Sequence, residues 1–508
     1  MTNQSINMFS WTLHVLLVFL TFLVTSIIAA VLKGSRRKHG QKQPPGPPGF
    51  PVLGHLHLLG ELPHRSLQTL ATTYGPIMSL RFGDVPTIVL SSAAAAELLL
   101  KSHDTVFSNR PLLEALEYFS YGFKGLVFSE YGPYWRNMRK LCWLNLLSTS
   151  KVESFAPLRM KEVEKMVEEV EKAAMSGQII NLTEVVNDVL ESMVYRMILG
   201  CDTGKNNGHD LKGIVQEVMH LSGAFNLTDY VPWLGKFDLQ GMRRQFKKTS
   251  KALDEMLEEI IKEHEKVFSS KAKHDDFIDI LLSLMYEHDE VDRTNIKAIA
   301  VDMIGASLET SAVIIVWALS ELLRNPRIMK NLQHELDAVI GPGNLVEEKD
   351  VGKLNYLEMV IKETFRLHPT GSLLLRETLE DVEVGGYYVE KKTRIIVNMW
   401  ALGRDPKAWP EKTEEFWPER FLETEVDFSG RESLMFMPFG TGRRGCPGMQ
   451  LGLFTVKLVV AQLIRCFRWE LPAGMAPENL DMKEKFGLSM PKAEPLLAVP
   501  SYRFRAKS

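Results

Sequence analysis

The run from Asn295 to Asn325, NIKAIAVDMIGASLETSAVIIVWALSELLRN, is apolar on nearly every side when placed on a helix, and it ends directly before Pro326. A helix with so little polar face is expected to be buried, so this one should cross the centre of a large domain. Helical periodicity with charged and apolar faces also occurs at residues 150–174 and 327–341. The sequence therefore predicts a mainly α domain.

The β part of the chain is expected to be small. IMSLRFGDVPTIVLS (77–91) has the pattern of a hairpin, and VEVGGYYVEKKTRIIVN (382–398) has that of another pair of strands. No internal repeat interrupts the chain, and the polar stretch 269–276 is expected to be a surface connection. Residues 55–508 are therefore predicted to form one large domain.

A second apolar run lies near the N-terminus. Met8–Leu32 carries no fixed charge, and as a helix it would be roughly 37 Å long against a hydrocarbon core of about 30 Å. A cleaved signal peptide is the alternative, but its apolar region is usually shorter and follows a basic segment. Residues 1–32 are therefore predicted to be an uncleaved membrane anchor.

The residues after this run predict which side of the membrane the domain occupies. Basic side chains follow the apolar run at once, and none precedes it: Lys33, Arg36, Arg37, Lys38 and Lys42. The positive-inside rule leaves the rest of the chain in the cytosol. The proline-rich PPGPPGFPVLG (44–54) is stiff and extended, so residues 33–54 are expected to be a spacer.

Composition excludes some functions. The 508 residues have a formal net charge of −3 and no basic tail, which gives no reason to expect nucleic acid as a partner. The four cysteines are too scattered for a disulfide framework: Cys142, Cys201, Cys446 and Cys466. A reducing compartment is the better interpretation.

The central helix has a polar island at Ser307, Glu309, Thr310 and Ser311. Helix-bound hydroxyls often donate back to the carbonyl four residues earlier, so the island has an ordinary structural explanation. However, Ala306 and Thr310 share one helical face, which places a small residue one turn from a hydroxyl. That face could border a flat ligand.

Charged residues form two further patterns. Glu363 and Arg366 are three apart on a helical segment, and Arg420, beside a proline and aromatics, could join them in a network. Trp135 and Arg139 are four apart on another helix. Taken singly, each group is best explained as structural.

FGTGRRGCPG (439–448) places Cys446 among four glycines and two arginines, directly before an apolar segment. Glycines permit a tight turn, and cysteine is a small residue that is easily buried. The alternative is that Cys446 is a ligand.

Taken together, these patterns resemble a microsomal cytochrome P-450 of the plant A-type branch. The resemblance covers almost the whole chain and is carried by these motifs: Trp135-x-x-x-Arg139, Ala306 to Ser311, Glu363-x-x-Arg366, Pro418-Glu419-Arg420-Phe421, and Phe439-x-x-Gly442-x-Arg444-x-Cys446-x-Gly448. It implies a mostly α fold of prism shape, a haem b cofactor and dioxygen as co-substrate. It also implies electrons from an NADPH-dependent reductase, lipid as a partner, and the endoplasmic reticulum membrane as the location.

The resemblance also assigns roles to residues. Cys446 would be the axial thiolate of the haem iron, within the loop that Phe439 and Gly440 open. The propionate contacts would be Trp135, Arg139, Arg376 and Arg444. Glu309 and Thr310 would be the acid and alcohol that deliver protons during oxygen activation. Glu363, Arg366 and Arg420 would form the structural network.

Three positions depart from the family pattern. Ser307 stands where glycine is usual, which changes how the central helix bends around oxygen. Glu309 replaces the commoner aspartate and lengthens the acid by one methylene. The segment LLLRE (373–377) lacks the proline that many plant members have before the arginine. The first two departures do not remove the predicted proton relay, and the third is expected to change how residues 370–375 overhang the haem.

The predicted substrate pocket is apolar or aromatic, and its residues are Phe119, Phe123, Phe225, Ala306, Leu373, Leu374 and Leu488. This indicates a small lipophilic substrate, either phenolic or terpenoid, with aromatic compounds slightly favoured because the phenylalanines could stack on a ring. The alternative is that these phenylalanines only pack the access channel. Monooxygenation is the leading hypothesis. The alternatives are a haem-thiolate isomerase or dehydratase, whose members usually lack the acid–alcohol pair, and a non-catalytic haem carrier or sensor.

Overall fold

A computed structural model of the chain describes residues 14, 21, 42–201, 210–268, 276–287, 291–341, 344–424 and 426–503. The predicted anchor therefore lies outside the described residues except at His14 and Thr21. The same holds for the spacer before Lys42 and for the predicted surface connection before Asp276.

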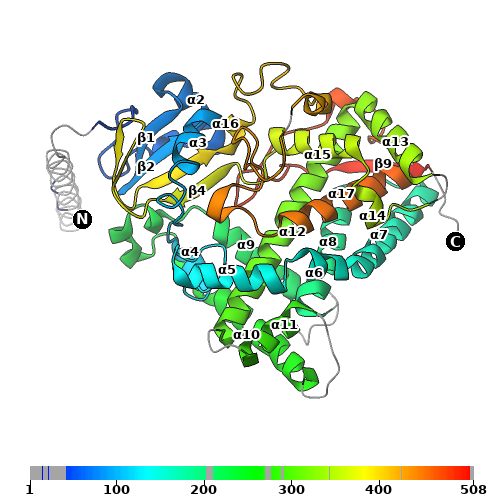
Figure 1. Cartoon of the computed structure of the whole chain (residues 1–508), viewed down its shortest axis with the longest axis horizontal. Helices are drawn as coiled ribbons and strands as arrows, with labels where there is room; N and C mark the ends of the chain where they lie inside the picture. Colours follow the sequence, from blue (N-terminus) through cyan, green and yellow to red (C-terminus); the bar gives the residue numbers. More distant parts are fainter. Residues whose placement is uncertain are drawn as a thin grey trace, which may run out of the picture.

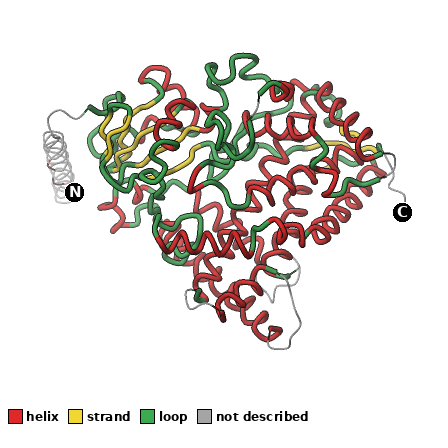
Figure 2. Tube along the Cα trace, viewed as in Figure 1, coloured by secondary structure: helices red, strands yellow, loops and turns green. Residues whose placement is uncertain are grey.

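Helices fill most of the molecule, and the strands of the main sheet gather at one side (Figures 1 and 2). The longer helices are α2 (Pro63–Tyr74), α5 (Pro133–Asn145), α7 (Ala156–Ser176), α8 (Leu182–Leu199), α9 (Leu211–Gly223), α10 (Met242–Phe268), α11 (Phe277–Glu287), α12 (Arg293–Arg324), α13 (Pro326–Ile340), α15 (Asn355–Leu367) and α17 (Met449–Cys466). The shorter helices are α3 (Ala93–Leu100), α4 (Glu114–Phe119), α6 (Thr149–Ser154), α14 (Glu348–Val351) and α16 (Met399–Leu402). The prediction of a mainly α fold with a small β part is confirmed.

The main sheet has the strand order β1-β2-β7-β4. β1 (Ile77–Phe82) and β2 (Val85–Leu90) form the hairpin predicted at 77–91. β7 (Arg394–Asn398) pairs parallel with β2 and antiparallel with β4 (Leu373–Glu377). The main sheet therefore joins segments that are far apart in the chain.

The remaining strands form two small sheets. β5 (Val382–Val384) pairs with β6 (Tyr387–Val389), and β9 (Leu497–Tyr502) lies between β3 (Ile180–Asn181) and β8 (Phe467–Glu470). The prediction of one strand pair at 382–398 was incomplete. That segment holds three strands, and the third leaves its neighbours to pair in the main sheet.

The central helix predicted from its uniform apolarity is α12. Its N-terminus is closed by a capping box, in which Asp292 accepts from the Asn295 amide and Asn295 accepts from the Asp292 amide. It ends directly before Asn325 and Pro326, where proline begins the next helix. The caps and the proline therefore set both ends of this helix.

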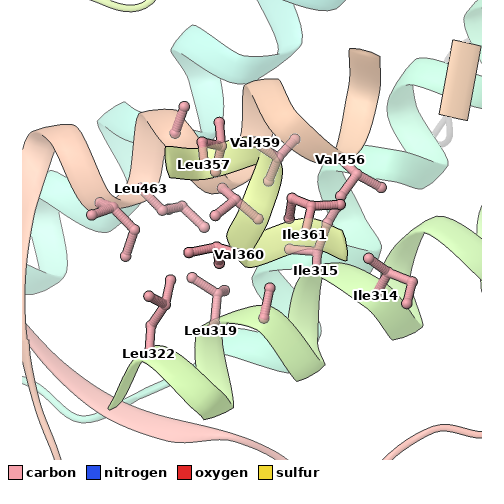
Figure 3. Packing of buried hydrophobic residues seen from close by; sticks show 14 of the residues in the cluster. Ile314, Ile315, Leu319, Leu322, Leu357, Val360, Ile361, Val456, Val459 and Leu463 are labelled. Atoms are coloured by element: carbon pink, nitrogen blue, oxygen red, sulfur yellow. The ribbon is translucent and has the colours of Figure 1, made fainter. Parts of the chain in front are cut away.

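The core packs around α12, α15 and α17. Figure 3 shows Ile315 and Leu319 of α12 facing Val360 and Ile361 of α15, with Val459 of α17 alongside. Among the described residues, α12 and α17 are long and apolar enough to cross a membrane, and most of each apolar stretch is buried within the fold. Their hydrophobicity is therefore explained by their place in the core.

The described half of the predicted spacer packs on β1 of the main sheet and on β6 of a small sheet. The Ser79 amide donates to the Pro45 carbonyl over 2.8 Å, and the Tyr388 amide donates to the Lys42 carbonyl over 2.8 Å. A side chain at Gly46 would collide with the Ser79 carbonyl. Residues 42–54 are therefore attached to the folded domain.

Candidate functional site

An internal cavity of about 350 Å³ lies between α12 and the loop that precedes α17. One wall comes from residues 437–440, 444 and 446–448 of that loop, together with Trp135 and Arg139 of α5. The other includes Ala306 and Thr310 of α12. The cavity therefore joins the two sequence regions that were predicted to face a common ligand.

The loop before α17 turns tightly. Gly440 and Gly442 have φ values of 69° and 63°, the left-handed region that side chains disfavour. A side chain at Gly442 would also collide with the Asp104 carboxylate. The Cys446 amide donates to the Phe439 carbonyl over 2.8 Å, which closes the loop and places the cysteine beside the first turn of α17.

The Cys446 side chain is exposed, and the space that it faces is the cavity. Burial within the protein raises the pKa of its thiol, while the Gly448 backbone amide and the positive charge of Arg139 act in the opposite direction. A backbone donor and a cation close to a sulfur favour its thiolate form. These are the surroundings that a metal-binding thiolate requires.

Four arginines gather near this loop. Arg139 donates to the Gly445 carbonyl over 2.7 Å, and Arg444 donates to the Ser108 carbonyl over 2.8 Å. Arg376 donates to the Thr441 carbonyl over 3.3 Å, and Arg110 donates to the carbonyl of Leu375. We call Arg110, Arg139, Arg376 and Arg444 the arginine cluster.

The arginine cluster has positive charge without a matching acid. In the described part of the chain none of the four forms an ion pair, and the nearby Asp104 pairs with Arg443. Burial lowers the pKa of Arg444 to about 9, and the neighbouring Arg110 and Arg139 add to this effect. Burial likewise lowers the pKa of Arg110 to about 10.

Several donors of the cluster are also left over. Nε and Nη1 of Arg376, Nη1 of Arg444 and Nε of Arg110 are buried without a hydrogen-bond acceptor. Unsatisfied buried donors are costly, and buried cations more so. The cluster therefore fits an anionic ligand with several oxygens, such as the two propionates of a haem.

Trp135 was expected to contact a propionate, but its indole N–H is already hydrogen-bonded within the protein. Its indole nitrogen donates to the Leu126 carbonyl over 3.0 Å. Its ring instead supports two cations, with the Arg444 guanidinium 4.2 Å and that of Arg139 5.3 Å from the ring centroid. The structure thus places Trp135 as a platform beneath the arginine cluster.

On the facing wall, Ala306 and Thr310 are exposed on an otherwise buried helix because they border the cavity. The Thr310 hydroxyl donates to the Ala306 carbonyl over 2.6 Å. Ser307 donates to the Met303 carbonyl over 2.5 Å, and α12 runs through this position without a break. The serine hydroxyl therefore takes part in the helix where the family usually has glycine.

Glu309 lies off the cavity wall. Its Oε1 accepts a hydrogen bond of 2.5 Å from the Ser489 hydroxyl, and its Oε2 is buried without a hydrogen-bond partner. The predicted acid and alcohol are thus adjacent in the chain but face different surroundings.

Two charged residues of the cavity wall were missed by the sequence analysis, Arg110 and Asp302. Arg110 follows Asn109, whose backbone bridges to Glu377 of β4, so its place in the cluster depends on a long-range pairing. Asp302 lies one turn before Ala306, and its carboxylate accepts from the amides of Leu126 and, over 3.0 Å, Val127. The sequence offered one signal for Asp302, an acidic residue on an otherwise apolar stretch of the central helix.

The predicted pocket residues separate into two groups. Ala306, Leu373 and Leu374 line the cavity. The other four lie outside its lining: Phe119, Phe123, Phe225 and Leu488.

Each of these four residues has another setting. Phe119 is buried with its ring edge on Phe246, and Phe225 is half-exposed and stacked on Tyr230. Phe123 lies in a turn with its amide donating to Ser120, and Leu488 lies against the backbone of Gly223. Ring stacking on a substrate therefore has no support from these phenylalanines.

The predicted network of Glu363, Arg366 and Arg420 is assembled away from the cavity. Arg366 donates to both Glu363 oxygens over 2.7 and 2.9 Å, and Arg420 donates to the same oxygens over 3.0 and 3.1 Å. The remaining guanidinium nitrogens donate to backbone carbonyls of the segment 403–415. The network holds that segment against α15.

Comparisons with known proteins decide the family. The model of the cytochrome P450 family matches residues 44–499. The chain belongs to the cytochrome P450 family. It is 51% identical to cytochrome P450 CYP736A12 of Panax ginseng, over 97% of this chain and 98% of the relative. It is 38% identical to the 3,9-dihydroxypterocarpan 6A-monooxygenase of Glycine max, over 95% of this chain and 97% of the relative.

A solved structure shows the same fold. A zebrafish cytochrome P450 determined with abiraterone superposes with a TM-score of 0.72 at 24% identity, covering 87% of this chain and all of that one. At this identity the likeness shows the fold alone. It confirms the predicted P450 fold, and the plant relatives confirm the predicted plant branch of the family.

Membership of the P450 family settles the class of enzyme and the cofactor. The chain is a monooxygenase that uses haem with a cysteine thiolate ligand and dioxygen as co-substrate. The family implies a redox partner that passes on electrons from NADPH and a lipophilic substrate, and plant members are typically membrane-bound. The thiol, the unsatisfied arginine donors and the cavity between them fit a haem with two propionates.

Proposed function

We propose that this P450 hydroxylates a lipophilic plant metabolite of the phenolic or terpenoid class, with haem b bound at Cys446 and electrons supplied by an NADPH–cytochrome P-450 reductase. The observation that carries the proposal is one continuous cavity. It brings the Cys446 thiol, three members of the arginine cluster (Arg110, Arg139 and Arg444) and the face of α12 with Ala306 and Thr310 to a single space. Those are the parts that oxygen chemistry on a substrate requires.

Residues on the Cys446 side would hold the cofactor. The Cys446 sulfur would bind the iron, supported by the Gly448 amide, and Phe439 and Gly440 would line the haem face. The free donors of Arg376 and Arg444 would bind the propionates, with Trp135 keeping Arg139 and Arg444 in place. When bound, haem supplies the electron transfer and oxygen activation that no side chain can perform.

Residues on α12 would deliver protons and leave room for the substrate. The Thr310 hydroxyl donates to the Ala306 carbonyl, so its oxygen lone pairs remain available to accept a hydrogen bond from the cavity. Glu309, next in the chain, would hold a proton at its carboxylate and exchange it with the neighbourhood of Thr310. The Ala306 methyl leaves room for a substrate close to this hydroxyl.

The cavity wall indicates the chemical class of the substrate. Leu373, Leu374 and Met303 add apolar surface next to Ala306, whereas Asp302 and Thr370 are among the few polar groups. An apolar wall with few polar groups selects a lipophilic molecule. The soybean relative, which is named for a dihydroxypterocarpan substrate, supports a phenolic compound as the first to test.

The N-terminus completes the proposal. Residues 1–32 would anchor the chain in the endoplasmic reticulum membrane with a single span, and the basic residues after it would keep the catalytic domain in the cytosol. Because residues 42–54 pack on the sheet, the spacer would be short, and the domain proposed at 55–508 would include them. The domain would then lie close to the lipid in which lipophilic substrates dissolve.

The test combines a spectrum with turnover. Cys446→Ser should abolish the absorption typical of carbon monoxide on a thiolate-ligated ferrous haem, because a serine oxygen is a harder and poorer donor. The native enzyme, with reductase, should consume NADPH and dioxygen and form a hydroxylated product. A thiolate spectrum in the variant would refute Cys446 as the ligand.

The choice of reaction is tested in the same assay. Product formation from a peroxide without NADPH would favour a haem-thiolate isomerase or dehydratase. Haem binding without any turnover, across phenolic and terpenoid libraries that do shift the haem absorption, would favour a carrier or sensor.

A further inference from the structure

Residues 484–492 near the C-terminus form a short hairpin, which we call the C-terminal hairpin. Glu484 and Lys492 form an isolated antiparallel bridge, and the Lys485 amide donates to the Pro491 carbonyl over 2.9 Å. None of these residues was assigned a catalytic role from the sequence, and the hairpin lies outside the cavity lining.

Both arms of the hairpin are fixed to the body of the protein. Glu484 accepts from the side chains of His64 over 3.1 Å and of Arg65, both on α2. The Met490 carbonyl accepts from the Trp317 indole of α12 over 2.9 Å. The hairpin is therefore a held element that spans two distant helices.

The tip of the hairpin contacts two elements that border or flank the site. Leu488 lies against Gly223 at the end of α9, where an added side chain would collide with the Leu488 backbone. Ser489 is buried, and its hydroxyl donates to Glu309 Oε1 over 2.5 Å. The tip therefore connects α9 to the acid of α12.

The contact with Ser489 defines where the Glu309 carboxylate lies. Among the described residues, the Ser489 hydroxyl is the only hydrogen-bond donor recorded to Glu309, and Oε2 of the same carboxylate is buried without one. Hydrogen bonds to charged groups are the strong ones, and a buried carboxylate without any donor is costly. Loss of this one hydroxyl would leave the carboxylate free to reorient.

We propose that Ser489 is a positioning residue that holds the Glu309 carboxylate, so that the tip of the C-terminal hairpin sets the place of the proton-delivering acid. The proposal rests on the function proposed above for Glu309. It adds that an element outside the cavity lining controls that acid, and that the end of α9, which packs on the tip, is mechanically connected to it.

The experiment compares five full-length, haem-loaded variants with reductase and substrate. They are Ser489→Ala, Ser489→Thr, Glu309→Gln, the double variant Ser489→Ala with Glu309→Gln, and the control Ser320→Ala. Ser320 is a buried serine of α12. Its hydroxyl donates to the Val316 carbonyl over 2.7 Å rather than to a carboxylate. The readouts are peroxide released per NADPH and amide hydrogen exchange of residues 484–492.

Ser489→Ala should raise peroxide release per NADPH at least about threefold, because a less ordered acid delivers protons less reliably. It should also speed exchange at the hairpin tip. Ser489→Thr should restore both values because it retains the hydroxyl. Glu309→Gln should raise peroxide release but keep slow exchange, since its amide oxygen still accepts from Ser489. The double variant should release no more peroxide than Glu309→Gln, and Ser320→Ala should match the native enzyme.

The outcomes separate the two proposals. Native coupling in Glu309→Gln would overturn the role of Glu309 and with it this inference. Raised peroxide in Glu309→Gln with native coupling in Ser489→Ala would overturn the positioning role alone. Faster exchange in Ser489→Ala without raised peroxide would show that the contact is only structural, and additive effects in the double variant would show that Ser489 acts by another route.

Discussion

Two groups of buried arginines in this enzyme have opposite environments. Arg366 and Arg420 share Glu363, and every guanidinium nitrogen of the pair has an acceptor. Arg376 and Arg444, buried to a similar depth, have no acid partner among the described residues and keep donors without acceptors. The first group is complete within the chain, and the second needs a ligand.

The difference shows that a buried charge has a different consequence when it is paired and when it is not. A buried cation that is fully paired stabilises one arrangement of the backbone, here the attachment of the segment 403–415 to α15. Burial and the neighbouring Arg110 and Arg444 hold the pKa of Arg376 well below its usual range. A buried cation without a partner is unfavourable, so we expect the second group to be stabilised when an anion, such as a haem propionate, binds to it.

The largest expected effect is the loss of stability when the network of Glu363, Arg366 and Arg420 is disrupted. Glu363→Gln removes the charge that two buried guanidiniums share, and breaking a buried pair in this way costs about 3–5 kcal/mol. We expect low yield of folded protein, and urea unfolding followed by circular dichroism should show the loss. Glu97→Gln, which breaks the exposed pair with Lys101, should cost no more than about 0.5 kcal/mol. Equal effects in the two variants would contradict the comparison.

The second prediction has the opposite sign for stability. Arg376→Met removes a buried charge that lacks a partner, so the haem-free chain should become more stable by about 1–3 kcal/mol. Haem loss to a competing haem acceptor should become about tenfold faster, since a charged hydrogen bond to a propionate is lost. Thermal unfolding of the haem-free chain and haem transfer measure the two effects.

A control for this prediction is Arg404→Met. Arg404 is also buried, but it donates to the Leu367 carbonyl over 2.8 Å and to Glu414 over 3.1 Å. This variant should lose stability and keep its rate of haem loss. If Arg376→Met behaved in the same way, the arginine cluster would be structural rather than a site for an anion.

The two groups also differ in how far the sequence predicts them. Glu363 and Arg366 are three residues apart on one helix, so their contact follows from local geometry. The contribution of Arg376 came from family resemblance, and Arg110 was missed. Both depend on β4 and on its bridge to Asn109, a long-range pairing that no local pattern specifies.

The same limit explains the other differences. The uniform apolarity of α12 predicted a central helix because it reflects burial on all sides. The pocket phenylalanines could not be placed in this way, because an apolar ring can face a cavity, the core or the surface equally well. Phe119 and Phe225 found aromatic neighbours from α10 and the segment after α9 instead.

The third and smallest predicted effect is on the pH dependence of stability. It concerns Asp302, a buried carboxyl group whose hydrogen-bond donors are neutral backbone amides. Burial raises the pKa of this carboxyl to about 6, although the amides of Val127 and Leu126 oppose the shift. Between about pH 4 and 6 the folded chain therefore keeps a proton that the unfolded chain has released, and stability falls as the pH rises through this window. Asp302→Asn cannot ionise and escapes that loss, but its amide oxygen makes weaker hydrogen bonds.

We expect a net effect of no more than about 1 kcal/mol at neutral pH, with Asp302→Asn gaining relative to the native chain as the pH rises from about 4 to about 7. The control is Asp292→Asn at the start of the same helix. Partial burial there is outweighed by the Lys124 hydrogen bond, so the pKa of Asp292 is lowered and its contribution is lost as the pH falls. The difference in Tm between each variant and the native chain should therefore change in opposite directions with pH for the two variants. Parallel trends would mean that Asp302 has a charged partner, and the distinction between paired and unpaired buried charges would fail at this position.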